Sequence, residues 1–124
     1  MSEQQVVPMI HVPDVRATAA WYGSIGFAVV NTFEDDDELT FALLSYGNSQ
    51  IMLSAGGRPS TEDRRDVDLY IRTEDVEALY HRLKDRVEIR LGLDITFYGT
   101  REFTVRDPNR YWVTFGQDVG EPEA

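Results

Sequence analysis

The stretch VVPMIHVPDVRATAAWYGSIGF, residues 6–27, predicts a buried strand followed at once by an amphipathic helix. The strand is a short run rich in β-branched residues, and Asp14 behind it is a residue type that caps helix N-termini. Val15, Ala19 and Tyr22 then recur on one helix face, before two glycines end the helix. The strand and the helix together are the first two elements of a module.

The same order of elements begins again in the second half of the chain. DVDLYIRT, residues 66–73, predicts a strand, and Asp75 opens a second helix 61 residues after Asp14. Each helix is followed by three strand-like runs. These are FAVVNTF, LTFALLSY and SQIMLSA in the first half, and VEIRLGLDITF, REFTVRD and RYWVTFGQ in the second. The pattern indicates an internal repeat of architecture with little sequence identity.

We therefore predict an α+β fold of two βαβββ modules. Their strands form a curved mixed sheet around a concave cavity, and their helices cover the outer face. One domain is expected, because 124 residues are too few for two independent domains of ordinary size. The first module covers about residues 6–54, a Gly- and charge-rich linker covers 55–65, the second module covers 66–117, and residues 118–124 are a flexible acidic tail.

The composition limits the partners that the chain can have. A net charge of −10 repels phosphate backbones and anionic membranes, so neither nucleic acid nor a membrane is an expected partner. An acidic surface attracts cationic ligands, although keeping the protein soluble is a simpler role for it. The absence of cysteine excludes thiol nucleophiles and thiolate metal sites. No apolar run is long enough to cross a bilayer, and the start, MSEQQVV, lacks a secretory pattern, so a cytoplasmic location is expected.

Two segments resemble signatures of the vicinal oxygen chelate superfamily: IHVPDVRATAAWYGSIGF, residues 10–27, and GTREFTVRDPNRYWVTF, residues 99–115. This superfamily contains glyoxalase I, extradiol dioxygenases, fosfomycin-resistance enzymes and the bleomycin resistance proteins. The resemblance runs from about Val6 to Gln117 and is nearest to the bleomycin resistance proteins. In those proteins an aromatic residue just before the glycine of a similar hairpin lines the drug groove, and Tyr98 has that place here. The resemblance implies a homodimer.

The resemblance also implies where a metal would bind in this fold. Metal-dependent members carry His, Gln or Glu at four cavity-facing strand positions, which fall here on Val7, Met52, Asp68 and Thr114. Only Asp68 is a donor of the kind that a divalent transition metal prefers, and one carboxylate does not hold such an ion. We therefore expect no metal and no cofactor. The alternative is a metal-dependent glyoxalase- or dioxygenase-like enzyme acting on vicinal oxygens, which requires a different register.

Strand parity selects the side chains that face the cavity. If Val7 and Asp68 face it, then every second residue along these strands does so too, and Asp68 and Arg72 add charge to the lining. The same rule applies to the strand before the linker and to the last strand. The predicted ligand-binding residues are Met9, His11, Met52, Tyr70, Arg72, Tyr98, Trp112 and Thr114.

Aromatic and thioether side chains of this kind suit a flat or cationic organic ligand. We expect a metal-independent small-molecule binding protein of the bleomycin-resistance type. It would sequester a hydrophobic or cationic aromatic compound, such as an antibiotic, in a dimer groove, and no residue is assigned a catalytic role. Other readings stay open: the large side chains fill a collapsed core, Asp68 and Arg72 form structural ion pairs, or His11 or Tyr70 serves a cofactorless enzyme.

Overall fold

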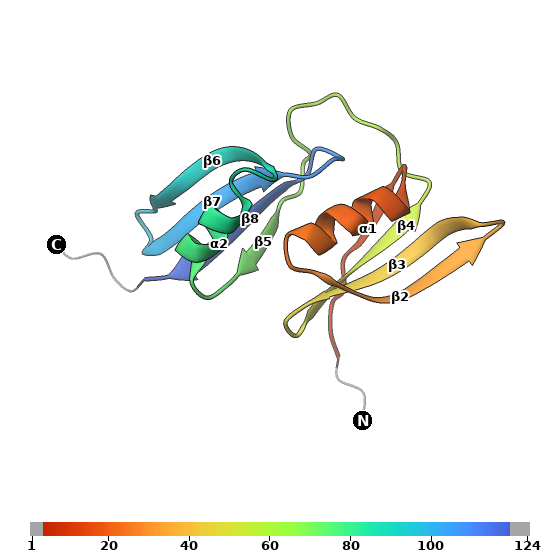
Figure 1. The fold of residues 1–124 in the computed structure, drawn as a ribbon, viewed down its shortest axis with the longest axis horizontal. Helices are drawn as coiled ribbons and strands as arrows, with labels where there is room; N and C mark the ends of the chain where they lie inside the picture. Colours follow the sequence, from red (N-terminus) through yellow and green to blue (C-terminus); the bar gives the residue numbers. More distant parts are fainter. Residues whose placement is uncertain (1–3, 120–124) are drawn as a thin grey trace. The chain divides into compact units, whose positions relative to one another are not determined.

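The computed structural model describes residues 4–119, and the chain divides between Ser60 and Thr61 into two compact units. Each described unit has the order strand, helix and three strands, which confirms the α+β class and the repeat (Figure 1). The predicted acidic tail lies, from residue 120 onward, outside the described residues. Unit 1 contains β1 (Met9–Val12), α1 (Val15–Ser24), β2 (Ala28–Asp35), β3 (Glu38–Tyr46) and β4 (Ser49–Ala55). Unit 2 contains β5 (Leu69–Arg72), α2 (Val76–Leu83), β6 (Glu88–Ile95), β7 (Thr100–Arg106) and β8 (Trp112–Asp118).

Each unit has one four-stranded mixed sheet. The strand orders are β1-β4-β3-β2 in unit 1 and β5-β8-β7-β6 in unit 2. β1 runs parallel to β4 and β5 runs parallel to β8, whereas the other neighbours are antiparallel and joined by short turns. In the parallel pairs Met9 is level with Met52, and Tyr70 is level with Thr114. The first strand of each repeat therefore ends up beside the last strand of the same repeat.

Both helices begin at the aspartates that the sequence identified. The Asp14 carboxylate accepts a hydrogen bond of 3.0 Å from the Ala17 amide, and Asp75 accepts one of 3.3 Å from Ala78. Each bond satisfies one of the amide groups that the first turn of a helix leaves without a partner. Among residues 4–119, neither helix combines the length and the apolar character needed to cross a membrane.

Each helix packs on one face of its own sheet and buries the core there. In unit 1, Val12, Leu44 and Leu53 are fully buried together with Tyr22 of α1. In unit 2 the aromatic rings of Phe103 and Phe115 stack with centroids 5.1 Å apart. The fully buried side chains around them are those of Leu83, Val76, Val105 and Val113. Burial of one such side chain contributes about 1.5 to 3 kcal/mol. We call the sheet face that a unit's own helix does not cover the open face of that unit.

The acidic residues between β2 and β3 form a tight hairpin turn. Asp36 and Asp37 have φ of 52° and 66°, and they connect β2 to β3. Two successive residues with positive φ are typical of the hairpin turns that match strand twist, and aspartate tolerates this region better than most residues. A register shift between Phe33 and Glu34 follows the turn, and beyond it Phe33 lies level with Phe41 on the open face.

Candidate ligand-binding site

The open face of unit 1 is largely apolar. Met9, Met52 and Leu43 are level with one another on β1, β4 and β3, so their side chains form one row across the sheet. His11 and Ser54 start the next row, and one ring nitrogen of His11 lies 3.4 Å from the Ala55 carbonyl oxygen. Met9 is 51% exposed, which leaves a flexible thioether accessible on this face. The structure thus places Met9, His11 and Met52 on the same face, in the arrangement that parity requires.

The open face of unit 2 is more polar. Tyr70 and Thr114 are level on β5 and β8, and the Thr114 hydroxyl lies 2.8 Å from the hydroxyl of Thr104 on β7. Arg72, Gly116 and Glu102 form the next row. The Arg72 side chain is exposed. Tyr70, Arg72 and Thr114 therefore share one face, and Glu102 of β7 joins them.

Glu102 is the centre of a hydroxyl cluster on this face. Its Oε2 atom accepts hydrogen bonds from the Tyr70 hydroxyl at 2.5 Å, the Thr100 hydroxyl at 2.8 Å and the Tyr98 hydroxyl at 2.9 Å. Tyr98 precedes β7 and Tyr70 comes from β5, so the cluster joins segments that are distant in the sequence. Hydrogen bonds from neutral donors to a carboxylate are shorter and stronger than bonds between two neutral groups. The cluster therefore holds two tyrosines in place around one negative charge.

Gly116 provides the space that Tyr70 needs to reach Glu102. Gly116 lies on β8 between Arg72 and Glu102 in the cross-strand row, and the Tyr70 hydroxyl lies against it. A Cβ atom built on Gly116 would be 2.0 Å from the Tyr70 hydroxyl oxygen. Any larger residue would push the tyrosine away from the carboxylate, because two such atoms cannot approach within 3.0 Å. The glycine is thus part of the construction of the cluster.

Tyr70 should titrate above the ordinary pKa of a tyrosine. Partial burial, and then its hydrogen bond to Glu102, raise the pKa of Tyr70 above its ordinary value of 10.0. Since the folded state holds this proton more tightly, the related stability is present below pH 10 and is lost as the pH rises above it. We expect the Tyr70 signal, followed by ¹³Cζ NMR, to move toward the ordinary pKa in Glu102→Gln. An unchanged midpoint in that variant would remove Glu102 as a cause.

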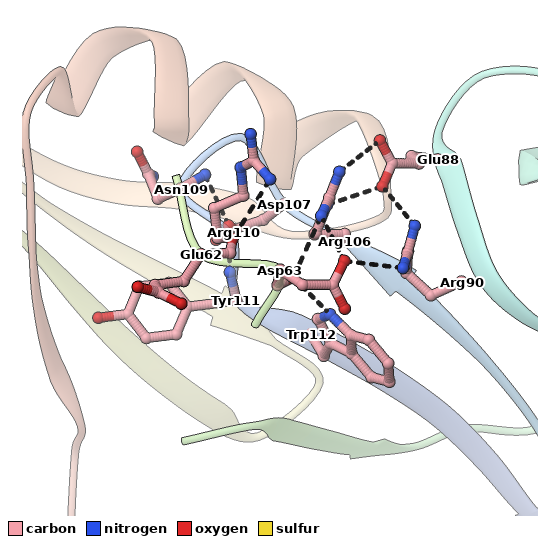
Figure 2. Close-up of polar contacts among 10 residues, drawn as sticks. All are labelled: Glu62, Asp63, Glu88, Arg90, Arg106, Asp107, Asn109, Arg110, Tyr111 and Trp112. Carbon is pink, nitrogen blue, oxygen red and sulfur yellow. Dashed lines mark hydrogen bonds and ion pairs between the residues drawn. The ribbon is translucent and has the colours of Figure 1, made fainter. Parts of the chain in front are cut away.

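Trp112 packs against side chains of its own unit. The Arg64 guanidinium lies 4.1 Å from the ring centroid, and the indole Nε1 donates a 3.1 Å hydrogen bond to the Asp63 carbonyl oxygen. Arg106, level with Trp112 on β7, donates to the Asp63 carboxylate at 3.1 Å and forms an ion pair with Glu88 at 2.7 Å (Figure 2). The segment before β5 is therefore fastened across this end of the open face.

The turn between β7 and β8 is fastened to the same segment. The buried Asp107 carboxylate accepts hydrogen bonds from the amides of Asn109 at 2.8 Å and Tyr111 at 2.9 Å. These two bonds shape the turn that begins with Asp107, Pro108 and Asn109. Arg110 donates to the Glu62 carbonyl oxygen at 3.2 Å (Figure 2). Arg65, at the end of the predicted linker, donates to the Asn109 carbonyl oxygen at 2.9 Å. Residues 62–65 thus pack on unit 2.

A family model described as the glyoxalase/bleomycin resistance protein/dioxygenase superfamily matches residues 4–115. The chain belongs to this superfamily. None of the curated proteins with which the sequence was compared matches it. The superfamily assignment agrees with the repeat, the two mixed sheets and the helix on each of them.

Solved structures share the fold of this chain at low sequence identity. TioX from Micromonospora sp. ML1 has a TM-score of 0.77 at 18% identity, over 94% of this chain and 100% of TioX. A bleomycin-binding protein complexed with bleomycin has a TM-score of 0.70 at 20% identity, over 94% and 99%. The E126Q mutant of FosX from Listeria monocytogenes, complexed with Mn(II) and a dihydroxypropylphosphonic acid, has 0.74 at 13%, over 95% and 94%. At these identities the likeness establishes the fold.

The positions where members of the superfamily hold a metal do not fit one in this chain. Val7, Met52 and Thr114 carry no imidazole or carboxylate. The Asp68 carboxylate accepts hydrogen bonds from Arg64, one of them 3.1 Å long from Nε. Within residues 4–119, no three His, Asp or Glu side chains come together in a group that could hold a metal ion. Among these four positions only Asp68 carries a carboxylate, and Arg64 of the same unit pairs with it.

Two features of the open face of unit 2 were missed by sequence reasoning. The sequence shows Glu102 only as one residue of the motif GTREFTVRDPNRYWVTF, although strand parity applied to β7 puts it on the same face as Thr104. The contacts of Asp63 were missed because residues 55–65 show no periodicity, so nothing in the sequence signals where this segment packs. Parity was available for the first feature, and no local signal existed for the second.

Proposed function

We propose that this protein binds a hydrophobic or cationic aromatic small molecule and holds it without changing it. The observation that carries the proposal is the chemistry of the open faces, which combine accessible apolar and aromatic groups with the Glu102 carboxylate. On unit 2 the rings of Tyr70 and Tyr98 are accessible, with 46% and 56% of these residues exposed. On unit 1 the row of Met9, Met52 and Leu43 adds adaptable apolar surface. The proposed ligand contacts are Met9, His11, Met52, Tyr70, Arg72, Tyr98, Trp112 and Thr114.

The state of Tyr70 does not favour its use as a general base. Its hydroxyl donates to Glu102, and its pKa is raised above the ordinary value of 10.0. A tyrosine that acts as a base needs a lowered pKa, so the environment here has the opposite effect. The Glu102 carboxylate has three hydroxyl donors on one oxygen, which holds the group in a fixed place.

The superfamily supports two further parts of the proposal. We infer a cytoplasmic homodimer that protects the cell against an antibiotic by sequestering it. A bleomycin-binding protein of the same fold was solved in complex with bleomycin, which makes bleomycin a reasonable first probe. Sedimentation equilibrium tests the dimer, since a particle that stays at the chain mass of 14.2 kDa at working concentrations would contradict it.

The binding function is tested by calorimetric titration with bleomycin and with 9-aminoacridine, a flat aromatic cation. Reversible binding is expected, with every probe molecule recovered at unchanged mass. Tyr98→Ala should weaken binding several-fold, because a contact between a cation and an aromatic face contributes about 0.5 to 2 kcal/mol. Phe33→Ala is the control, since Phe33 is an aromatic side chain of unit 1 that is 64% exposed and is not among the proposed ligand contacts. Conversion of a probe to a product, with or without added Mn²⁺, would favour the enzyme alternative.

A further inference from the structure

The arginines near Glu102 on unit 2 are engaged elsewhere. Arg106 and Arg90 pair with Asp63 and Glu88, and Arg64 pairs with Asp68. Among residues 4–119, Glu102 forms no ion pair with a basic side chain, although it lies on a face that carries several arginines. Its three partners are neutral hydroxyls. Its negative charge is therefore held in place and left without a counter-charge from the described residues.

The cross-strand row places a second carboxylate beside this charge. Asp94 on β6 is level with Glu102 on β7. Like charges that lie directly opposite each other on neighbouring strands destabilise a sheet. Arg72, at the other end of the row, is separated from Glu102 by the strand that carries Gly116. A cation bound at Glu102 would relieve the repulsion between the two carboxylates.

The groups that hold Glu102 are themselves suited to a cation. The rings of Tyr70 and Tyr98 carry the hydroxyls that bind Oε2, so both rings stand beside the carboxylate and both are about half exposed. Aromatic faces attract ammonium and guanidinium groups, and the attraction adds to that of a neighbouring carboxylate. All three hydroxyls bind the same oxygen, so Oε1 is the atom that remains to accept a hydrogen bond from a ligand.

We propose that Glu102, Tyr70 and Tyr98 form the subsite for the protonated nitrogen of the ligand. The chemical class is an aromatic compound with an ammonium, amidinium or protonated amino-heteroaromatic group. The cation donates a hydrogen bond to Glu102 Oε1 and contacts the rings of the two tyrosines. Gly116 keeps the place of Tyr70 clear, so the subsite is complete within unit 2. This inference rests on the proposed function, because it assigns one group of the sequestered ligand to one group of the protein.

The test compares two probes that share a ring system, 9-aminoacridine, which is protonated at neutral pH, and acridine, which is neutral. Dissociation constants are measured for the full chain and for Glu102→Gln, in which the amide oxygen still accepts from the hydroxyls. The control is Glu74→Gln, which removes the same charge from an exposed loop of the same unit. The full chain should prefer 9-aminoacridine roughly tenfold or more, the range of a hydrogen bond to a charged group. Glu102→Gln should lose this preference, and Glu74→Gln should keep it.

A second variant protects the test against a folding defect in Glu102→Gln. Tyr98→Leu removes one ring and leaves the carboxylate, and it should weaken 9-aminoacridine several-fold more than acridine. Equal affinity of the full chain for both probes would overturn the subsite while leaving the binding function standing. The same holds if the preference survives in Glu102→Gln. Failure of both probes to bind would overturn the subsite and would also count against the proposed function.

Discussion

Gly57→Ala is expected to destabilise the protein by about 3 kcal/mol, at the upper end of the usual cost of overpacking. A Cβ atom on Gly57 would lie 2.2 Å from the His11 carbonyl oxygen and 2.5 Å from the Val12 amide nitrogen. Both atoms belong to the backbone of β1, which is paired with β4 and cannot move away without losing that pairing. The Gly57 amide also donates a 3.2 Å hydrogen bond to the Val12 carbonyl oxygen. The strand that carries Met9 and His11 would therefore shift.

Gly23→Ala is the matched control for this substitution. Gly23 lies in α1, and no heavy atom would lie within 4 Å of its new Cβ. Alanine in a helix is more favourable than glycine by about 0.5 to 1 kcal/mol, so the same chemical change should raise the stability here. Urea unfolding, followed by circular dichroism, measures both variants. A Gly57→Ala protein as stable as the Gly23→Ala protein would show that β1 does not lie where the structure has it.

Arg106→Ala should lower the free energy of unfolding by about 2 kcal/mol. Breaking a fully buried ion pair costs about 3 to 5 kcal/mol, and the loss is smaller here because the partners of Arg106 are partly exposed. The Arg106 side chain is 14% exposed, whereas those of Asp63 and Glu88 are 62% and 49% exposed. Arg106 also donates a 3.1 Å hydrogen bond to the Asp63 carbonyl oxygen. Its removal leaves Asp63 and Glu88 with Arg90 as their shared basic partner. Amide exchange around Asp63 should rise together with the loss of stability.

Arg101→Ala is the control for Arg106→Ala, because it removes the same charge from a more exposed side chain. Arg101 lies on the same strand and forms one ion pair, 3.3 Å from Glu77, with side chains that are 35% and 56% exposed. An exposed pair of this kind contributes about 0 to 1 kcal/mol. Equal losses in the two variants, measured by urea unfolding, would contradict the special role of Arg106 in fastening residues 62–65.

The sequence predicted those features that local rules determine. Asp14 and Asp75 start the helices because a carboxylate at that position satisfies a free amide of the first turn. Met9 and Met52 share a face because side chains alternate along a strand, whichever strands turn out to be neighbours. These rules need no knowledge of which segments of the chain meet.

The Glu102 cluster and the packing of Trp112 depend on contacts between distant segments. Tyr70 reaches Glu102 only because β5 lies beside β8 and because Gly116 leaves space between them. Parity assigns Trp112 to the open face, but the arginine beside its ring, Arg64, comes from a segment without any periodic pattern. Such contacts follow from the pairing of the strands, which a single sequence does not reveal.

The two repeats carry different chemistry on the same backbone frame. The row of Met9, Met52 and Leu43 in unit 1 has its counterpart in the row of Tyr70, Thr114 and Thr104 in unit 2. Most of these side chains stand outside the fully buried core beneath the helices, so exchanges among them put little of the folding energy at risk. Substitutions on the open face of one unit can therefore change its surface chemistry without disturbing the buried core of either unit.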